Sequence, residues 1–261
     1  MFLKNAVSFF GKLFGKNQDH KQRILVIGGS GRVGSLILPY LSEENELTIL
    51  DLEAPPKGPW KYIRDNALDR RNLTKACKNQ EALIYLAVGK PHDNIEAAHD
   101  VNVKGLHLAL ESAWQAEILR AIYASTLSVY EDLHAFTEGQ ANNENNAPRP
   151  KRVYGLTKAL GEETCRFFSR KKGMTIFALR LFLPVSRKEW HEKKDGLNVD
   201  CRTSAPDVAR AFMAALKTDH EGFEIFHISG DYTGKVFSHE KAKRILNWGP
   251  MERPSYDSAS R

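Results

Sequence analysis

The sequence predicts an α/β fold in which helices cover both faces of a doubly wound parallel sheet. Short apolar, β-branched runs alternate with longer segments of helical periodicity from Arg23 onwards. A glycine-rich turn follows the first of these runs. The connections between successive runs are long enough to hold a helix, which favours parallel pairing with right-handed crossovers.

The expected elements follow in chain order. Strands are predicted at 24–27, 47–50, 60–63, 82–86, 121–124, 175–181 and 224–228. Helices are predicted at 33–41, 71–78, 95–117, 154–170, 206–216 and 238–246. Proline, glycine and asparagine indicate loops at 55–59 and 138–150. The charged stretch 187–198 is expected to be a flexible surface segment.

Composition places the chain among ordinary globular proteins. Its 261 residues are 42% hydrophobic, enough for one substantial core with a small lobe attached. Cys77, Cys165 and Cys201 form no CxxC pair, as expected of free thiols in a reducing compartment such as the cytoplasm. The net charge is +6, but lysine and arginine are scattered, so no nucleic-acid partner is expected. The histidines lack metal-ligand spacing, and no metal is predicted.

Residues 1–16 form a segment apart. Apolar residues recur at helical spacing, and Lys4, Lys12 and Lys16 supply positive charge. This amphipathic helix is predicted to lie on a membrane surface, contact a partner subunit or pack on the protein's own body. Its interrupted apolar pattern is not that of a secretory signal. With a polar linker following, the predicted domains are 1–22, 23–183 and 184–261.

The first turn has the residues of a dinucleotide-binding site. The run Gly28-Gly29-Ser30-Gly31-Arg32-Val33-Gly34 lies between the first predicted strand and helix. Glycine permits a tight turn and close approach of backbone to a pyrophosphate, and the helix directs free N–H groups at the phosphates. Residues 23–183 are therefore predicted to form a Rossmann-type NAD(P)-binding core.

Asp51 indicates which dinucleotide is bound. It ends the second strand about 20 residues after the first glycine, where a carboxylate accepts hydrogen bonds from the adenosine ribose. It would also repel a 2′-phosphate, so NAD is favoured. NADP is the alternative, because Arg32 could hold that phosphate. The other interpretation of Asp51 is a helix cap or turn former.

Two further strand ends are expected to contact the cofactor. Asp65 and Asn66 follow the third strand and could reach the adenine. Leu86, Ala87 and Val88 end the fourth strand and would line the pyrophosphate and nicotinamide-ribose side.

Tyr154 and Lys158 lie four residues apart on one face of a predicted helix. An ammonium close to a phenol lowers its pKa, so Tyr154 could act as a general acid or base near neutral pH. Lys158 could also bond the nicotinamide ribose. Thr126 follows the fifth strand, where its hydroxyl could hold a substrate oxygen against Tyr154. The alternative for the Tyr–Lys pair is a solvated helix face.

With these residues in order, the chain resembles the extended short-chain dehydrogenase/reductase family, often labelled NAD-dependent epimerase/dehydratase. The resemblance covers roughly residues 23 to 250. The matching segments are 28–34, Asp51, Asp65, 86–87, 101–105, 123–126, 154–158, 207–211 and 243–248.

The resemblance implies roles for four residues. Thr126 would orient the substrate, Tyr154 would be the acid/base and Lys158 its activator. Asn102 would support the long helix and the active-site water chain. Ser125 and Ser128 are candidate stand-ins for Thr126.

The implied function is an NAD(P)-dependent oxidoreductase acting on a sugar, a sugar acid or a related small molecule. One alternative is a nucleotide-sugar 4-epimerase that retains its NAD, and another is a non-catalytic NAD(P)-binding sensor or scaffold. The family's usual assembly would be a homodimer through the helices that carry Asn102 and Tyr154.

Departures from the family pattern narrow these expectations. Leu127-Ser128 stands where dehydratases carry an acidic pair, which disfavours a dehydratase, and Glu131 replaces a usual glycine. The short segment after Pro184 predicts a small C-terminal substrate lobe and a compact substrate, with a size similar to uronate dehydrogenases. Arg187 and Arg202 are interpreted as surface charges rather than partners of a substrate carboxylate.

Overall fold

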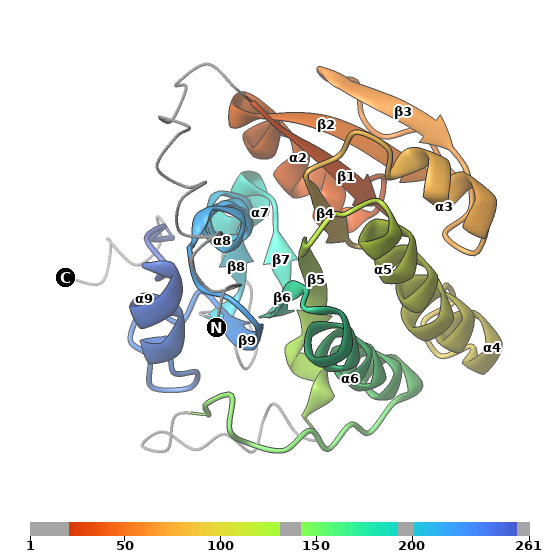
Figure 1. The fold of residues 1–261 in the computed structure, drawn as a ribbon. Helices are drawn as coiled ribbons and strands as arrows, with labels where there is room; N and C mark the ends of the chain where they lie inside the picture. Colours follow the sequence, from red (N-terminus) through yellow and green to blue (C-terminus); the bar gives the residue numbers. More distant parts are fainter. Residues whose placement is uncertain (1–20, 131–141, 193–200, 255–261) are drawn as a thin grey trace, which may run out of the picture.

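The computed structural model describes residues 21–130, 142–192 and 201–254, so the predicted helix at 1–16 lies outside the described residues. The strands of the central sheet are β1 (Gln22–Ile27), β2 (Asn45–Asp51), β3 (Trp60–Arg64), β4 (Ala82–Tyr85), β5 (Arg120–Thr126), β6 (Thr175–Leu181) and β9 (Phe223–Ile228). They are all parallel, in the order β3-β2-β1-β4-β5-β6-β9 (Figure 1). The strand order reverses at β1, since β2 and β3 lie on one side of it and β4, β5, β6 and β9 on the other. In open parallel sheets, ligands bind beside such a reversal at the carboxyl ends of the strands.

Helices cover both faces of this sheet (Figure 1). Alternate residues of β1 serve the two faces, because successive side chains of a strand point to opposite sides. Ile24 and Val26 are buried in one core cluster, and Leu25 and Ile27 in the other. The first cluster packs against α2 (Arg32–Glu44), α8 (Ala205–Lys217) and α9 (Glu240–Leu246). The second packs against α3 (Arg70–Ala76), α5 (Leu106–Gln115) and α6 (Val153–Lys172). The predicted doubly wound α/β fold is confirmed.

The predicted long helix at 95–117 contains a wider turn. It consists of α4 (Ile95–His99), the π-helical segment η1 (Asp100–Gly105) and α5. The Tyr85 hydroxyl donates a hydrogen bond of 2.6 Å to the carbonyl of Val101 within this segment. Such wider turns are frequent at functional sites.

The segment after β6 is more ordered than predicted. A two-stranded parallel sheet joins β7 (Pro184–Val185) to β8 (Thr203–Ser204), and α7 (Arg187–His191) lies between them in the sequence. Ser186 and Glu189 form a reciprocal capping box at the start of α7, and Trp190 is fully buried. The prediction of a flexible surface segment is therefore wrong for residues 187–191, and its end at 193–198 lies outside the described residues.

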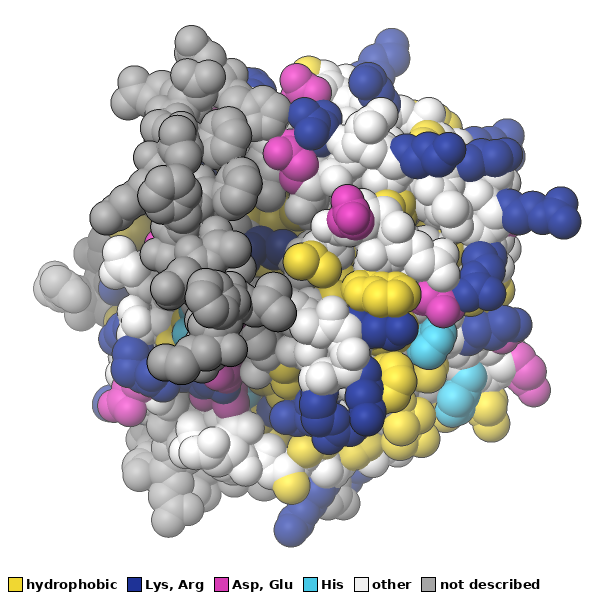
Figure 2. Space-filling model, viewed as in Figure 1, with side chains coloured by type: hydrophobic (Ala, Val, Ile, Leu, Met, Phe, Trp, Pro, Cys, Tyr) yellow, Lys and Arg dark blue, Asp and Glu magenta, His cyan; other side chains and the backbone are white. Residues whose placement is uncertain are grey.

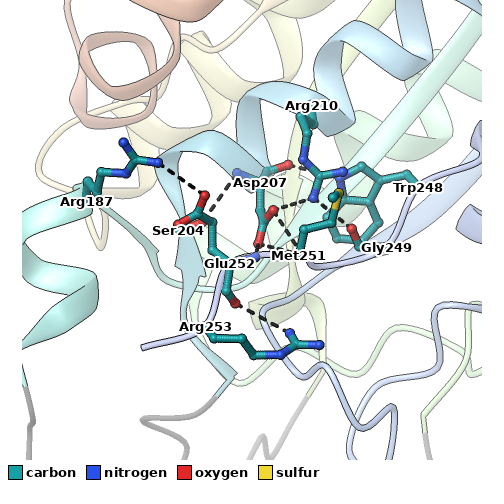
Figure 3. Close-up of polar contacts among 9 residues, drawn as sticks. All are labelled: Arg187, Ser204, Asp207, Arg210, Trp248, Gly249, Met251, Glu252 and Arg253. Carbon is teal, nitrogen blue, oxygen red and sulfur yellow. Dashed lines mark hydrogen bonds and ion pairs between the residues drawn. The ribbon is translucent and has the colours of Figure 1, made fainter. Parts of the chain in front are cut away.

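The last described residues are held against the start of α8 (Figure 3). The Asp207 carboxylate accepts backbone hydrogen bonds from Met251 and Glu252 and pairs with Arg210. The Trp248 indole donates a hydrogen bond of 3.0 Å to the Asp207 carbonyl. Since α8 and β9 both belong to the central layers, residues after 184 are built into the main core. The domain boundary at 183/184 stays a prediction.

No helix in the described ranges is both long and apolar enough to cross a bilayer.

Candidate active site

The glycine-rich turn between β1 and α2 is pressed against its neighbours. Gly28 has a φ of +84°, and a Cβ there would lie 2.3 Å from the Ala87 nitrogen. A Cβ on Gly34 would lie 2.1 Å from the Gly29 carbonyl oxygen. Gly31 is the N-cap of α2 and has no side chain to satisfy the first N–H groups of the helix. The turn therefore fits close approach by an anionic group such as a pyrophosphate.

A cavity opens beside this turn at the carboxyl ends of β1, β2 and β4. Among the predicted cofactor residues, nine line it: Gly28, Ser30, Gly31, Asp51, Asp65, Asn66, Leu86, Ala87 and Val88. The other lining residues are Ile27, Leu50, Leu52, Glu53, Ala67, Gly89, Lys90, Ala97 and Val101. Most of these additional residues are chain neighbours of predicted ones, and that adjacency was the signal available in the sequence.

Four residues of the predicted turn, Gly29, Arg32, Val33 and Gly34, do not line this cavity. Gly34 packs on the turn itself, and Val33 packs against the core. Arg32 points to the C-terminal part of the chain, where it donates to the Pro184 carbonyl and pairs with Glu189 at 3.1 Å. In this arrangement its guanidinium is engaged by the Pro184 carbonyl and the Glu189 carboxylate.

Asp51 is tied to the turn. Its Oδ2 accepts a hydrogen bond of 2.9 Å from the Ser30 backbone nitrogen, and the Ser30 hydroxyl donates 2.6 Å to the Glu53 carbonyl. The carboxylate therefore borders the cavity at the end of β2, where a ribose would bind.

Tyr154, Lys158 and Thr126 come together at the carboxyl end of β5. The Thr126 hydroxyl lies near enough to the Tyr154 phenol to influence its pKa. Lys158 is 2% exposed, and its ammonium donates a hydrogen bond of 2.8 Å to the Ala124 carbonyl. The pair on α6 is therefore not a solvated helix face. Because β5 is paired with β4, whose end lines the cavity, the two sites adjoin.

Burial controls the charge of this pair. It raises the pKa of Tyr154, and the neighbouring Thr126 hydroxyl opposes this. It lowers the pKa of Lys158 to about 8. This differs from the expectation that Lys158 lowers the pKa of Tyr154, because loss of hydration is the largest influence on the phenol and the ammonium is bonded to a backbone carbonyl.

Asn102 joins two parts of the site. From the π-helical segment, its Oδ1 accepts a hydrogen bond of 3.0 Å from the Gly89 nitrogen, and its Nδ2 donates 2.8 Å to the Thr157 hydroxyl. Asn102 therefore braces the loop after β4 against α6.

Of the two candidate stand-ins for Thr126, Ser125 is engaged elsewhere. The Ser125 hydroxyl donates a hydrogen bond of 2.6 Å to the Glu162 carboxylate, so it is part of a buried hydrogen-bond network. That network continues through Arg180 and Tyr130 to His227. Ser128 donates its backbone N–H to the Thr126 hydroxyl oxygen.

Sequence reasoning missed one residue that contacts Tyr154. The rings of His92 and Tyr154 are stacked, with centroids 5.0 Å apart and planes inclined by 16°. His92 lies in the loop after β4, and only its place after a strand end could have indicated it.

The two candidate arginines differ in their placement. Arg187 is an exposed charge that pairs with Glu252 at 3.3 Å (Figure 3). Arg202 is buried, and its guanidinium donates to the carbonyls of Glu189 and Glu192. The interpretation of Arg202 as a surface charge is therefore wrong, because the side chain stabilises the chain around Trp190.

The fold and these two adjoining sites define a Rossmann-type nucleotide-dependent enzyme. A family model described as the NAD dependent epimerase/dehydratase family matches residues 24–199. The chain belongs to this family and is an NAD-dependent enzyme.

Several known proteins are similar to this chain. The L-arabinose 1-dehydrogenase (NAD(P)(+)) of Haloferax volcanii is 26% identical over 183 residues, 66% of this chain and 71% of that protein. The uronate dehydrogenase structure from Agrobacterium tumefaciens has a TM-score of 0.78 at 18% identity, covering 92% of this chain and 88% of that one. The UDP-N-acetylglucosamine 4-epimerase structure from Bacillus cereus has a TM-score of 0.72 at 20% identity, covering 89% and 92%. The two structural likenesses show a shared fold.

Proposed function

We propose that this chain is an NAD-dependent dehydrogenase that interconverts a hydroxyl and a carbonyl group on a sugar, a sugar acid or a related small molecule. The observation that carries the proposal is the placement of Tyr154, Thr126 and the buried Lys158 at the carboxyl end of β5, beside the dinucleotide cavity. A phenol and an alcohol held together in this way can bind one substrate oxygen between them.

The residues divide the work of the oxidation. Thr126 orients the substrate hydroxyl, and Tyr154 takes its proton at the phenolate oxygen. The hydrogen on the carbinol carbon leaves with its electron pair as the C=O bond forms. Bound NAD supplies the acceptor for that hydride. In the reverse direction Tyr154 returns the proton to the carbonyl oxygen.

Burial raises the pKa of Tyr154, so the proposed role of the buried Lys158 cation is to oppose that effect when the phenolate forms. A cation in a poorly solvated site favours a nearby anion more strongly than it would in water. The same side chain would also bond the ribose of the cofactor. The cofactor itself would be held by the glycine-rich turn and by Asp51, whose charge favours NAD over NADP.

The position after Thr126 supports a dehydrogenase over a dehydratase. Leu127 is fully buried, and its hydrocarbon side chain offers no acid or base for elimination. The likeness to an L-arabinose 1-dehydrogenase supports a sugar hydroxyl as the reacting group.

The test is an absorbance assay for NADH formation with a panel of aldoses, uronic acids and simple alcohols. We expect turnover with one of these substrate classes, complete loss of turnover in Tyr154→Phe, and unchanged NADH binding in that variant. Tyr232→Phe is the matched control, since Tyr232 is an exposed tyrosine and the substitution keeps its ring. Full activity in Tyr154→Phe would contradict the mechanism. Interconversion of UDP-sugars without net NADH formation would identify a 4-epimerase instead.

A further inference from the structure

The loop between β4 and α4 connects the dinucleotide cavity to the catalytic tyrosine. Val88, Gly89 and Lys90 line the cavity. Two residues further on, His92 lies with its ring stacked on Tyr154. His92 is exposed and Tyr154 is half-buried, so the imidazole covers a face of the phenol that the body of the protein does not.

The backbone on both sides of His92 is fixed. Before it, a Cβ on Gly89 would lie 2.0 Å from the Ala97 carbonyl oxygen, so the loop is pressed onto α4. After it, the Asn94 nitrogen donates 3.0 Å to the Pro91 carbonyl, and the Asn94 side chain caps α4 by accepting from Ala97. The His92 imidazole therefore projects from a short loop whose backbone is held in place on both sides.

The same loop is joined to the helix that carries Tyr154. Asn102 accepts from Gly89 and donates to Thr157, three residues beyond Tyr154. Asn102 thus sets the distance between the loop and α6, and the ring stack lies across that gap. The hydrogen bonds of Asn102 and the stack of His92 on Tyr154 together fix the position of the phenol relative to the loop.

We infer that His92 is a positioning residue for Tyr154, holding the phenol ring so that its hydroxyl stays at Thr126; this inference rests on the proposed function. A half-buried tyrosine ring that is open on one face can rotate about its side-chain torsions. A stacked ring opposes that rotation through dispersion and quadrupole contacts. The flat ring is the feature that acts, and the imidazole nitrogens are not required.

Three variants of the full-length protein separate these contributions. His92→Ala removes the ring, and we expect kcat to fall about tenfold with the KM for NAD unchanged, because misplacement of a reacting group slows the chemical step without affecting distant contacts. His92→Phe restores a flat ring, and we expect kcat within about twofold of the wild-type value. Asp93→Ala changes the exposed neighbour in the same loop and should leave kcat unchanged. Wild-type kcat in His92→Ala, or equal loss in His92→Phe and His92→Ala, would overturn the inference.

A second measurement is independent of turnover. In protein with ring-labelled tyrosine, the NMR resonance of Tyr154 is identified by its disappearance in Tyr154→Phe. We expect this resonance to shift in His92→Ala, because the ring current of the imidazole is lost, and to stay close to its original position in His92→Phe. If the wild-type protein oxidises none of the sugars, the proposed function fails, and the resonance still decides whether His92 holds the ring. A resonance that does not move in His92→Ala contradicts the inference.

Discussion

Glu162 and Arg180 form a bidentate ion pair that is almost completely buried. Arg180 donates from Nε at 2.8 Å and from Nη2 at 2.7 Å to the two carboxylate oxygens, and the two side chains are 2% and 1% exposed. Glu162 lies one turn beyond Lys158 on α6, and Arg180 lies on β6. The pair therefore attaches α6, the helix that carries Tyr154 and Lys158, to the sheet.

Removing the charge of Glu162 should strongly destabilise the fold. Glu162→Gln keeps the shape of the side chain but leaves the Arg180 cation buried without its carboxylate, which typically costs about 3–5 kcal/mol. The free energy of unfolding in urea measures this loss. Glu163→Gln is the matched control, because its pair with Arg166 is exposed on the same helix and should contribute less than about 1 kcal/mol. Equal unfolding midpoints for the two variants would show that the buried pair is not stabilising.

The pH dependence of stability should reflect His239. Burial lowers the pKa of this imidazole from 6.5 to about 4, and its Nε2 has no hydrogen-bond partner within the described ranges. The unfolded chain therefore binds a proton on His239 more readily than the folded protein does. The free energy of unfolding therefore does not depend on His239 above pH 6.5. Between pH 6.5 and 4, protonation of His239 in the unfolded chain lowers the free energy of unfolding by about 1 kcal/mol per pH unit.

Urea midpoints measured from pH 7 to pH 4 test the contribution of His239. In His239→Phe the decline should be shallower than in the wild-type protein, while His227, whose pKa burial also lowers, still contributes. A parallel decline in both proteins would exclude His239 as a source of the effect. His99→Ala, at a half-exposed histidine, should leave the slope unchanged.

Asp51 should determine the preference for NAD over NADP. Asp51→Asn keeps an oxygen that can accept from the Ser30 nitrogen but removes the charge that repels a 2′-phosphate. We expect the ratio of NADH affinity to NADPH affinity, measured by fluorescence titration, to fall roughly tenfold. This corresponds to about 1.4 kcal/mol in the difference between the two binding free energies. Glu46→Gln, at the opposite end of β2, should not change this ratio. An unchanged ratio in Asp51→Asn would mean that another residue selects the cofactor.

A hydrophobic stripe on α6 suggests that two copies of the chain associate, as the family resemblance implies. Leu156, Leu160 and Phe167 are each about 40% exposed and lie on one side of the helix. Figure 2 shows hydrophobic side chains gathered where α4, α5 and α6 lie in Figure 1. We expect a dimer through this face, and Leu160→Glu should shift it to a monomer in analytical ultracentrifugation.

A matched variant tests whether that effect belongs to the stripe. Leu119→Glu changes an exposed leucine outside the stripe, just before β5, and should leave the assembly unchanged. A wild-type protein that sediments as a monomer at micromolar concentration would refute the dimer.

The fold could be predicted from sequence because its signals are periodic and local. Short apolar or β-branched runs marked every strand of the central sheet, and glycines at 28 and 34 marked a turn where a side chain would collide with backbone. The placement of Tyr154 and Lys158 on one helix face followed from their four-residue spacing.

The parts that could not be predicted depend on contacts between distant residues. The stack of His92 on Tyr154 joins a loop and a helix, and the Glu162–Arg180 pair joins a helix and a strand. Neither leaves a periodic pattern. Residues 187–191 were misjudged because their charges suggested solvent exposure, whereas the burial of Trp190 fixes the helix.

The place of β9 at the end of the sheet has a consequence for protein synthesis. Among the residues that the structure describes, β9 pairs only with β6, and it is the last strand of the central sheet to leave the ribosome. Until Phe223–Ile228 emerges, the outer edge of β6 presents unpaired N–H and C=O groups, which are a template for pairing with another nascent chain. Translation that stops before Phe223 would therefore yield an aggregation-prone fragment, although such a fragment would already contain both the glycine-rich turn and Tyr154.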